Sequence, residues 1–303
     1  MDRHELAIVR TVVYASLFDY PLTLDQLRES LIGAAMTRDE ILALYESSAS
    51  LRSTIEHRDG FFYPTGRGGL VAERRRREAR SRAFLARHER LLQWICALPF
   101  TRMVALSGSI AHLNLDERGD LDLFIVTRGR RVWTVSVAAI VLTRLLGVRR
   151  IVCANFVMAD THLRVEPQDL FTANQILHLK PLIGDEVLDG FLAANPFVRR
   201  FYPNARATSR TGFALRVNRP LQTTKRILEA LLLVPSRPIE AICRRVYSWH
   251  LRRRARSWQS PEQVQLQADY LKLHTRSHRR SVLARFDDSV DEALGQKERA
   301  AIA

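Results

Sequence analysis

The chain has 303 residues, of which 47% are hydrophobic and 26% are charged, and its formal net charge is +15. This amount of apolar material excludes an intrinsically disordered or fibrous protein, and the length predicts two or three domains. Lysine stands at four positions, so that 43 of the 47 basic residues are arginine. An excess of arginine suits the binding of phosphate groups, and a GC-rich coding sequence gives the same composition.

Cysteine usage and apolar runs bear on where the protein resides. The three cysteines are far apart and in no CxxC spacing, which argues against a disulfide framework or a zinc ribbon and favours a reducing compartment. Residues 1–10 carry charged side chains and no apolar core of a signal peptide. The longest mostly apolar run, 132–142, has 11 residues, whereas a membrane-spanning helix needs about 20. We therefore expect a soluble, cytoplasmic protein without a transmembrane segment.

Residues 1–66 are expected to form a small N-terminal domain that begins with three helices. Apolar residues recur at helical spacing over 6–17. Thr23 is placed to cap a second helix, and Thr37 opens a capping-box sequence for a third.

A β-hairpin is expected to follow these helices. Short β runs at 54–56 and 61–63 flank Asp59-Gly60, a typical hairpin turn. Three helices followed by a hairpin is the element order of a winged helix-turn-helix, a fold that contacts DNA in some proteins and other proteins elsewhere. The third helix, 37–46, carries one arginine against three acidic residues, which argues against sequence-specific reading of a major groove.

A basic linker helix over 67–98 is expected to open a second domain, 67–185. Residues 67–90 contain nine arginines and three glutamates. The runs Arg74–Arg77 and Arg252–Arg254 would suit contact with a nucleic-acid backbone. The exposed face of an amphipathic helix explains such runs equally well.

Strand and helix signals then alternate. Strands are expected at 103–106, 121–126 and 151–158, and an apolar helix at 132–146. From about 170 onward the pattern is helical and interrupted by prolines, so 186–303 is expected to be a C-terminal helical region. The predicted fold class is α+β or α/β: a winged helix-turn-helix, a central domain with a short mixed sheet, and the helical region.

The residues with the clearest chemistry lie between the first two of these strands. The first strand leads into Ser107-Gly108-Ser109, where a short helix begins, and Gly108 lets the backbone approach a ligand closely. Asp120 and Asp122 follow at positions i and i+2 of the next strand, which puts both carboxylates on one face. Because Mg²⁺ prefers a few carboxylates together with substrate phosphates, this pattern predicts a magnesium site.

The same stretch resembles the DNA polymerase β-type nucleotidyltransferase superfamily. The pattern of that superfamily is a hydrophobic residue and Gly-Ser, about ten further residues, and then Asp-hydrophobic-Asp-hydrophobic. Gly108-Ser109 and Asp120-Leu121-Asp122 match it here, and the likeness extends over about 85–185. Residues 1–66 are similar to winged-helix domains that precede such modules, and 67–185 would be the nucleotidyltransferase domain.

The resemblance implies roles for the matched residues. Ser107, Gly108 and Ser109 would hold the triphosphate of an NTP, and Asp120 and Asp122 would ligate Mg²⁺ or Mn²⁺. The reaction implied is the transfer of a nucleoside monophosphate to an acceptor, which the sequence does not identify.

One feature of the superfamily is missing from the sequence. The superfamily uses a third carboxylate on a later strand, and the strand 151–158 contains no acid. Asn155 is expected in that position as a weak metal ligand, and Asp160 would replace it only if the strand bulges. The departure leaves a second class of function open, a catalytically degenerate regulator that binds nucleotide or nucleic acid.

Other candidate residues have plainer interpretations. His112 is expected on a helix surface. His274 and His278 have the i, i+4 spacing of metal ligands, and a solvated basic helix is the favoured explanation of that segment. The segment 226–251 suits either an anionic membrane surface or packing against the central domain, and packing is favoured.

Overall fold

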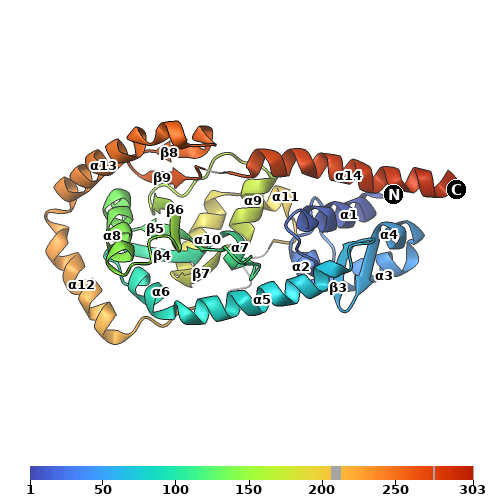
Figure 1. Cartoon of the computed structure of the whole chain (residues 1–303), viewed down its shortest axis with the longest axis horizontal. Helices are drawn as coiled ribbons and strands as arrows, with labels where there is room; N and C mark the ends of the chain where they lie inside the picture. Colours follow the sequence, from blue (N-terminus) through green and yellow to red (C-terminus); the bar gives the residue numbers. More distant parts are fainter. Residues whose placement is uncertain (206–212, 276, 303) are drawn as a thin grey trace.

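The computed structural model describes residues 1–205, 213–275 and 277–302, with side chains up to residue 295. This part of the chain forms a mixed α/β structure. It contains 14 α-helices, a six-stranded mixed sheet and a small three-stranded antiparallel sheet (Figure 1).

The N-terminal unit combines four short helices with the small sheet. Its elements are α1 (Arg3–Ser16), β1 (Leu22–Thr23), α2 (Leu24–Glu29), α3 (Arg38–Ser47), α4 (Ala49–Thr54), β2 (Ile55–Arg58) and β3 (Phe61–Pro64). Thr23 and Thr37 cap α2 and α3 as expected; Thr37 does so through the predicted capping box, and Thr23 forms one as well, with Gln26. The hairpin of β2 and β3 turns at Asp59 and Gly60, both at positive φ, and the strand order is β1-β3-β2.

The basic linker is two helices rather than the one that was expected. α5 (Gly69–Arg87) and α6 (Glu89–Cys96) meet at His88, whose backbone angles (φ −104°, ψ 13°) are not helical. The break lets α6 turn its apolar side, which includes Leu92 and Ile95, onto the central sheet.

The central sheet has the strand order β7-β4-β5-β6-β9-β8. Its strands are β4 (Thr101–Leu106), β5 (Leu121–Thr127), β6 (Val152–Ala159), β7 (Lys180–Ile183), β8 (Val264–Leu266) and β9 (Tyr270–Leu273). β4 and β5 are antiparallel neighbours, which confirms the pairing of the first two expected strands. β5 and β6 are parallel neighbours, and the crossover helix α8 (Val132–Leu145) joins them.

The expectation of an all-helical pattern beyond residue 170 is wrong at β7, β8 and β9. β9 pairs with β6, so the last third of the chain contributes two strands to the central sheet. These strands have only three or four residues each, too few for a period of two to stand out in the sequence. Lys272, in the middle of β9, is 3% exposed. Because lysine is rarely buried, its presence in the sequence does not indicate a buried strand.

Helices cover both faces of the central sheet. The remaining helices are α7 (Gly108–Ala111), α9 (Leu170–Leu177), α10 (Asp185–Ala194), α11 (Phe197–Phe201), α12 (Arg219–Leu233), α13 (Ser236–Arg253) and α14 (Arg279–Ile302). Leu121, Leu123 and Ile125 of β5 face a core shared with α6 and α8. Phe124 and Val126 face the opposite core, which α9, α10 and α11 close.

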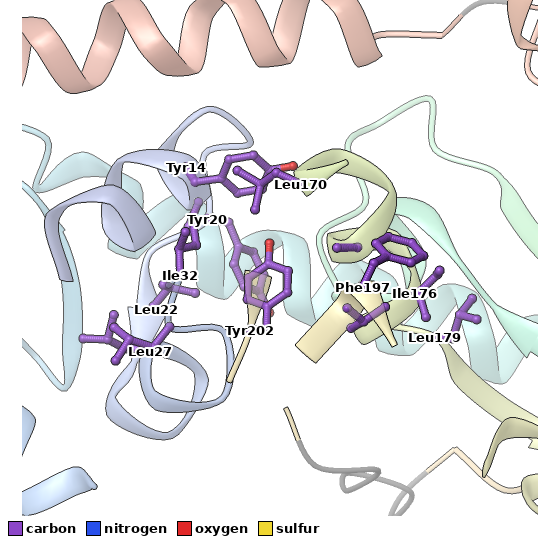
Figure 2. Close-up of a cluster of buried hydrophobic side chains, with 14 of the residues drawn as sticks. Tyr14, Tyr20, Leu22, Leu27, Ile32, Leu170, Ile176, Leu179, Phe197 and Tyr202 are labelled. Carbon is purple, nitrogen blue, oxygen red and sulfur yellow. The ribbon is translucent and has the colours of Figure 1, made fainter. Parts of the chain in front are cut away.

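The N-terminal unit and the central sheet share this second core. Figure 2 shows Tyr14 and Tyr20 of the N-terminal unit beside Leu170 and Tyr202. α14 then runs back along α1, and the two chain ends lie at the same end of the molecule (Figure 1). The N-terminal unit is therefore fixed against the sheet by a continuous apolar core.

Candidate functional site

Gly108 stands directly against the carboxylate of Asp122. β4 ends at Leu106, and the backbone N–H of Ser107 donates to the carbonyl oxygen of Asp122 at 2.9 Å. Gly108 then adopts φ +62°, and a Cβ added to it would overlap the Asp122 carboxylate. Only glycine suits a position that combines a left-handed backbone with so close a neighbour. The structure thus joins the Ser107-Gly108-Ser109 turn to the second of the two aspartates.

Four polar side chains meet beside this turn, two from each of the parallel strands β5 and β6. The thiol of Cys153 donates to Oδ2 of Asp120 at 3.0 Å. Nδ2 of Asn155 donates to Oδ1 of Asp122 at 2.8 Å. Asp120 and Asp122 are therefore brought together as expected, and Asn155 contacts the pair.

A β-bulge interrupts β6 directly after the residues that contact these carboxylates. Asp122 pairs with Cys153 and Phe124 pairs with Phe156, so that β6 has one residue more than β5 between the two pairs. Without the bulge Phe156 would face away from Phe124, whereas the two rings stack with centroids 5.0 Å apart. The bulge thus lets Cys153, Asn155 and Phe156 all face the same side of the sheet.

Burial and charge shift the pKa values of these groups. Burial and, to a smaller extent, the nearby Asp120 raise the pKa of Asp122 to about 7, against the opposing effect of the hydrogen bond from Asn155. Burial and the Asp120 carboxylate raise the pKa of the Cys153 thiol to about 12. At neutral pH the thiol is therefore protonated and acts as a hydrogen-bond donor.

The carboxylate pair fits a divalent cation. One ligand atom from each of Asp120, Asp122 and Cys153 lies within 4.8 Å of the others. Burial and the repulsion from Asp120 both raise the pKa of Asp122, and a cation between the two carboxylates would relieve that repulsion. Their oxygens suit Mg²⁺ or Mn²⁺, whereas the Cys153 sulfur is a softer donor that suits other transition metals better.

Asp160 lies outside this cluster. The bulge gives it the same facing as Asn155, and yet it stands just past the far end of β6. There its Oδ1 accepts from the backbone N–H of Gly129 at 2.8 Å, and its Oδ2 accepts from Arg102 at 3.2 Å. Asp160 is thus a structural acid that holds the end of β5 and β6 together.

A cavity of about 320 Å³ opens beside Gly108, Ser109 and Asp122. Its other walls come from the N-terminal unit, from α9 and from the segments that follow α7 and α11. They include the side chains of Tyr14, Tyr20, Ile32, His112, Asn114, Phe171, Asn174, His178 and Tyr202. No sequence motif marks these residues, because they lie far apart in the chain and meet only when the two units pack.

Two polar atoms of the cavity residues are buried without a hydrogen-bond partner among the described residues. They are the hydroxyl of Tyr14 and Oδ1 of Asn114. Leaving such groups unsatisfied costs about 1–3 kcal/mol each. Both atoms belong to residues of the cavity wall, and both are themselves covered by neighbouring protein atoms.

His112 is not the surface histidine that the sequence suggested. Its ring packs against Tyr20 and His178, with centroids 5.2 and 4.3 Å away. Burial, together with the charges of Arg74 and Lys180, lowers the pKa of His112 to about 3. Burial also holds the pKa of His178 well below its usual value. Both rings are neutral at pH 7.

The segment that carries His274 and His278 is not a solvated helix. His274 follows β9 and packs its ring 5.5 Å from that of Phe156, and burial lowers its pKa to about 4. His278 is exposed and precedes α14. A strand end and a turn therefore replace the helical repeat that the i, i+4 spacing requires. Arg276, which belongs to the same segment, lies outside the described residues.

Three of the four arginines in the run 74–77 of α5 make contacts within the chain. Arg74 is buried and its guanidinium lies 3.6 Å from the ring centre of Tyr20. Arg76 and Arg77 both pair with Glu73. Arg252, Arg253 and Arg254, in contrast, are exposed.

Comparisons with known proteins found no relative of this chain. No protein-family model matches the chain, and no curated protein and no solved structure matches it either. None of the helices described here has both the length and the apolar character needed to cross a membrane.

Proposed function

We propose that this protein is a metal-dependent nucleotidyltransferase of the DNA polymerase β type. The observation that carries the proposal is the contact between Gly108 and Asp122. It joins a glycine turn that suits phosphate to a pair of half-buried carboxylates that suits a divalent cation. We also assign residues 1–66 to a winged helix-turn-helix, on the basis of the capped helices and the hairpin.

In this proposal Asp120 and Asp122 would hold Mg²⁺ or Mn²⁺ together with the triphosphate oxygens. The ion would supply positive charge that stabilises the entering and leaving oxygens. Gly108 and Ser109 would position the triphosphate through their backbone N–H groups, with Ser107 beside them, whose own N–H is bonded to the Asp122 carbonyl. Cys153 and Asn155 would hold the two carboxylates in place by donating one hydrogen bond to each.

The transfer itself is an in-line displacement at the α-phosphorus of the NTP. An acceptor hydroxyl oxygen forms a bond to this phosphorus, and the bond from the phosphorus to the bridging oxygen breaks, so that pyrophosphate leaves. Asp122 is the one aspartate that lines the cavity, and we assign the hydroxyl proton to it.

The cavity beside Asp122 would receive the acceptor. Among the described residues the lining contains no lysine, arginine or glutamate; His112 and His178 are neutral at pH 7, and His278 stands at its edge. A volume of about 320 Å³ suits a small molecule. We therefore assign the acceptor to small uncharged molecules with a hydroxyl group, and we assign the N-terminal unit to holding it, because Tyr14, Tyr20 and Ile32 form one wall.

A pyrophosphate-release assay tests the proposal. The protein is incubated with Mg²⁺, each of the four NTPs and a panel of uncharged hydroxyl compounds, and the same NTPs with RNA form a second arm. We expect release with the small compounds and its loss in Asp120→Ala and Asp122→Ala. The matched control is Asp116→Ala, because Asp116 is an exposed acid of the preceding loop.

A second function is favoured by one observation. The position where a third carboxylate would stand holds the amide of Asn155 and the thiol of Cys153. A site with two carboxylates would bind nucleotide without turning it over, and the protein would then be a nucleotide- or nucleic-acid-binding regulator. NTP binding by calorimetry with no pyrophosphate release across the panel would select this function.

A further inference from the structure

Helices α12 and α13 each carry an apolar stripe that faces solvent. The stripe residues recur at i, i+4 and i+7 and are between 53% and 89% exposed. They are Ile227, Leu231 and Val234 of the first stripe, and Ile242, Val246 and Trp249 of the second. We call these six residues the outer face. It lies at the end of the molecule opposite to α3 and α4 (Figure 1).

The outer face is separate from the sides by which the two helices are anchored. The Glu229 carboxylate of α12 accepts from the backbone N–H of Phe100 at 2.7 Å. The Glu240 carboxylate of α13 accepts from the N–H groups of Trp133 and Thr134, at 2.9 and 2.8 Å, at the start of α8. Cys243 and Tyr247 pack on the core of the central sheet. The expected packing against the central domain is therefore present, and a second apolar side of each helix is left over.

Basic residues surround the outer face. Residues 219–256 contain nine arginines and one lysine, and their only acids are Glu229 and Glu240. Both of those carboxylates are engaged on the anchored side, as described above. The exposed arginines of this segment include Arg226, Arg237, Arg245, Arg252 and Arg253. No acidic residue of 219–256 therefore balances the positive charge on the solvent side of the two helices.

We propose that the outer face binds the surface of an anionic lipid bilayer. Apolar side chains flanked by arginines match a layer with an apolar interior and negatively charged headgroups. Trp249 has the guanidinium of Arg253 3.7 Å from its ring centre, an arrangement that suits the boundary between headgroups and acyl chains.

Two other occupants fit less well. A second copy of the chain would bring the same arginines against these arginines, which repel one another. Nucleic acid offers phosphates to the arginines but no apolar surface of comparable extent to the six stripe residues. The lipid surface is independent of the nucleotidyltransferase proposal, because the outer face shares no residue with the site around Asp122.

Vesicle co-sedimentation of the full chain tests the proposal. Vesicles of phosphatidylcholine mixed with phosphatidylglycerol are compared with vesicles of phosphatidylcholine alone, at low and at high salt. We expect binding to the mixed vesicles, weaker binding at high salt because the charges are screened, and little binding to phosphatidylcholine. Arg245→Glu combined with Arg252→Glu should lower the partition coefficient by at least about 25-fold, since each basic residue near an anionic surface contributes about five-fold.

A second variant separates lipid insertion from charge attraction alone. Ile242→Gln combined with Val246→Gln keeps every charge and removes no buried packing, and it should also weaken binding to the mixed vesicles. The control with the same charge change is Arg58→Glu with Arg75→Glu, at two exposed arginines on β2 and α5. Circular dichroism verifies that all variants are folded.

Each outcome of these experiments either supports or overturns the proposal. Binding that falls in both outer-face variants and stays intact in the control supports the proposal. Failure of the wild-type chain to sediment with mixed vesicles overturns it, as does unchanged binding of the Ile242→Gln, Val246→Gln variant. Capture of RNA or of an acidic protein by the same arginines, without vesicle binding, would assign the outer face to that partner instead.

Discussion

Gly108 has no room for a side chain because the carboxylate of Asp122 fills the space where its Cβ would stand. Gly108 and Asp122 belong to the two halves of the motif and lie 14 positions apart in the sequence, and the antiparallel pairing of β4 with β5 brings them together. A phosphate held by the turn and a cation held by the carboxylate would therefore be immediate neighbours. The contact makes the glycine and the aspartate one structural unit.

Substituting Gly108→Ala should damage both stability and ligand binding. An alanine at φ +62° is strained, and its Cβ would push the Asp122 carboxylate out of place. We expect the free energy of unfolding to fall by about 1–3 kcal/mol, the usual cost of such a conformation, and NTP binding to weaken. Urea unfolding and calorimetric titration with NTP and Mg²⁺ measure the two effects.

The control for this substitution is Gly190→Ala. Gly190 lies inside α10, and a Cβ there would meet only Leu163 Cδ1 at an ordinary 3.8 Å. Alanine should raise the free energy of unfolding by about 0.5–1 kcal/mol, because it favours the helix. If Gly108→Ala raised the free energy of unfolding as Gly190→Ala is expected to do, the close contact of Gly108 with Asp122 would have no energetic consequence.

Asn155→Asp should have opposite effects with and without metal. Without metal, a third carboxylate beside Asp122 replaces a hydrogen bond with repulsion, so the free energy of unfolding should fall. With Mg²⁺, the new carboxylate should tighten binding by about 1–2 kcal/mol, roughly ten-fold, if it ligates directly. Nucleotide and Mg²⁺ should each strengthen the binding of the other, as linkage requires.

Chemical unfolding with and without Mg²⁺, together with calorimetry, measures these effects. Asn155→Ala is the matched control, since it removes the same hydrogen bond without adding charge. Equal Mg²⁺ affinity in the wild-type, Asn155→Asp and Asn155→Ala proteins would contradict a place for Asn155 in the metal shell.

Local patterns in the sequence predicted those parts of the fold that depend on neighbouring residues. Thr23 and Thr37 cap helices because their hydroxyls and the following side chains are three residues apart. Asp59-Gly60 turns the hairpin because both residues tolerate positive φ. The face shared by Asp120 and Asp122 follows from the two-residue period of a strand.

Features that depend on tertiary packing could not be predicted from such local patterns. The bulge in β6 puts Phe156 on the same side of the sheet as Cys153 and Asn155, and no residue type indicates it. His112 is buried because the N-terminal unit folds over it and sets Tyr20 against its ring. Lys272 is buried in a short strand whose partner, β6, lies more than a hundred residues earlier.

Cys153→Ser should change the choice of metal rather than the affinity for Mg²⁺. A serine hydroxyl still donates to Asp120, so the geometry of the carboxylates is kept. Removing the sulfur takes away the one soft donor within 4.8 Å of both carboxylates, so binding of Cd²⁺ should weaken while binding of Mg²⁺ stays the same. Competition titrations with the two ions measure this. Unchanged Cd²⁺ affinity would exclude the thiol as a ligand.

Three buried histidines should make the protein lose stability in mild acid. Burial lowers the pKa of His112 to about 3 and that of His274 to about 4, and it also lowers the pKa of His178. The unfolded chain takes up protons on these rings below about pH 6.5, while the folded chain does not. The free energy of unfolding should therefore fall as the pH drops from 6.5 toward 4, by on the order of 1–2 kcal/mol per histidine at pH 5.

His274→Gln isolates one of these contributions, because glutamine has no charge to gain on acidification. Urea unfolding at pH 7 and pH 5 should give a smaller difference between the two pH values for His274→Gln than for the wild-type protein. The reference variant is His4→Gln, at an exposed histidine of α1, and it should keep the wild-type difference. Because the comparison is between differences, the titration of carboxylates common to all three proteins cancels. An identical pH dependence in His274→Gln and wild type would mean that His274 is protonated equally in the folded and unfolded chains, and its burial against Phe156 would then have no energetic consequence.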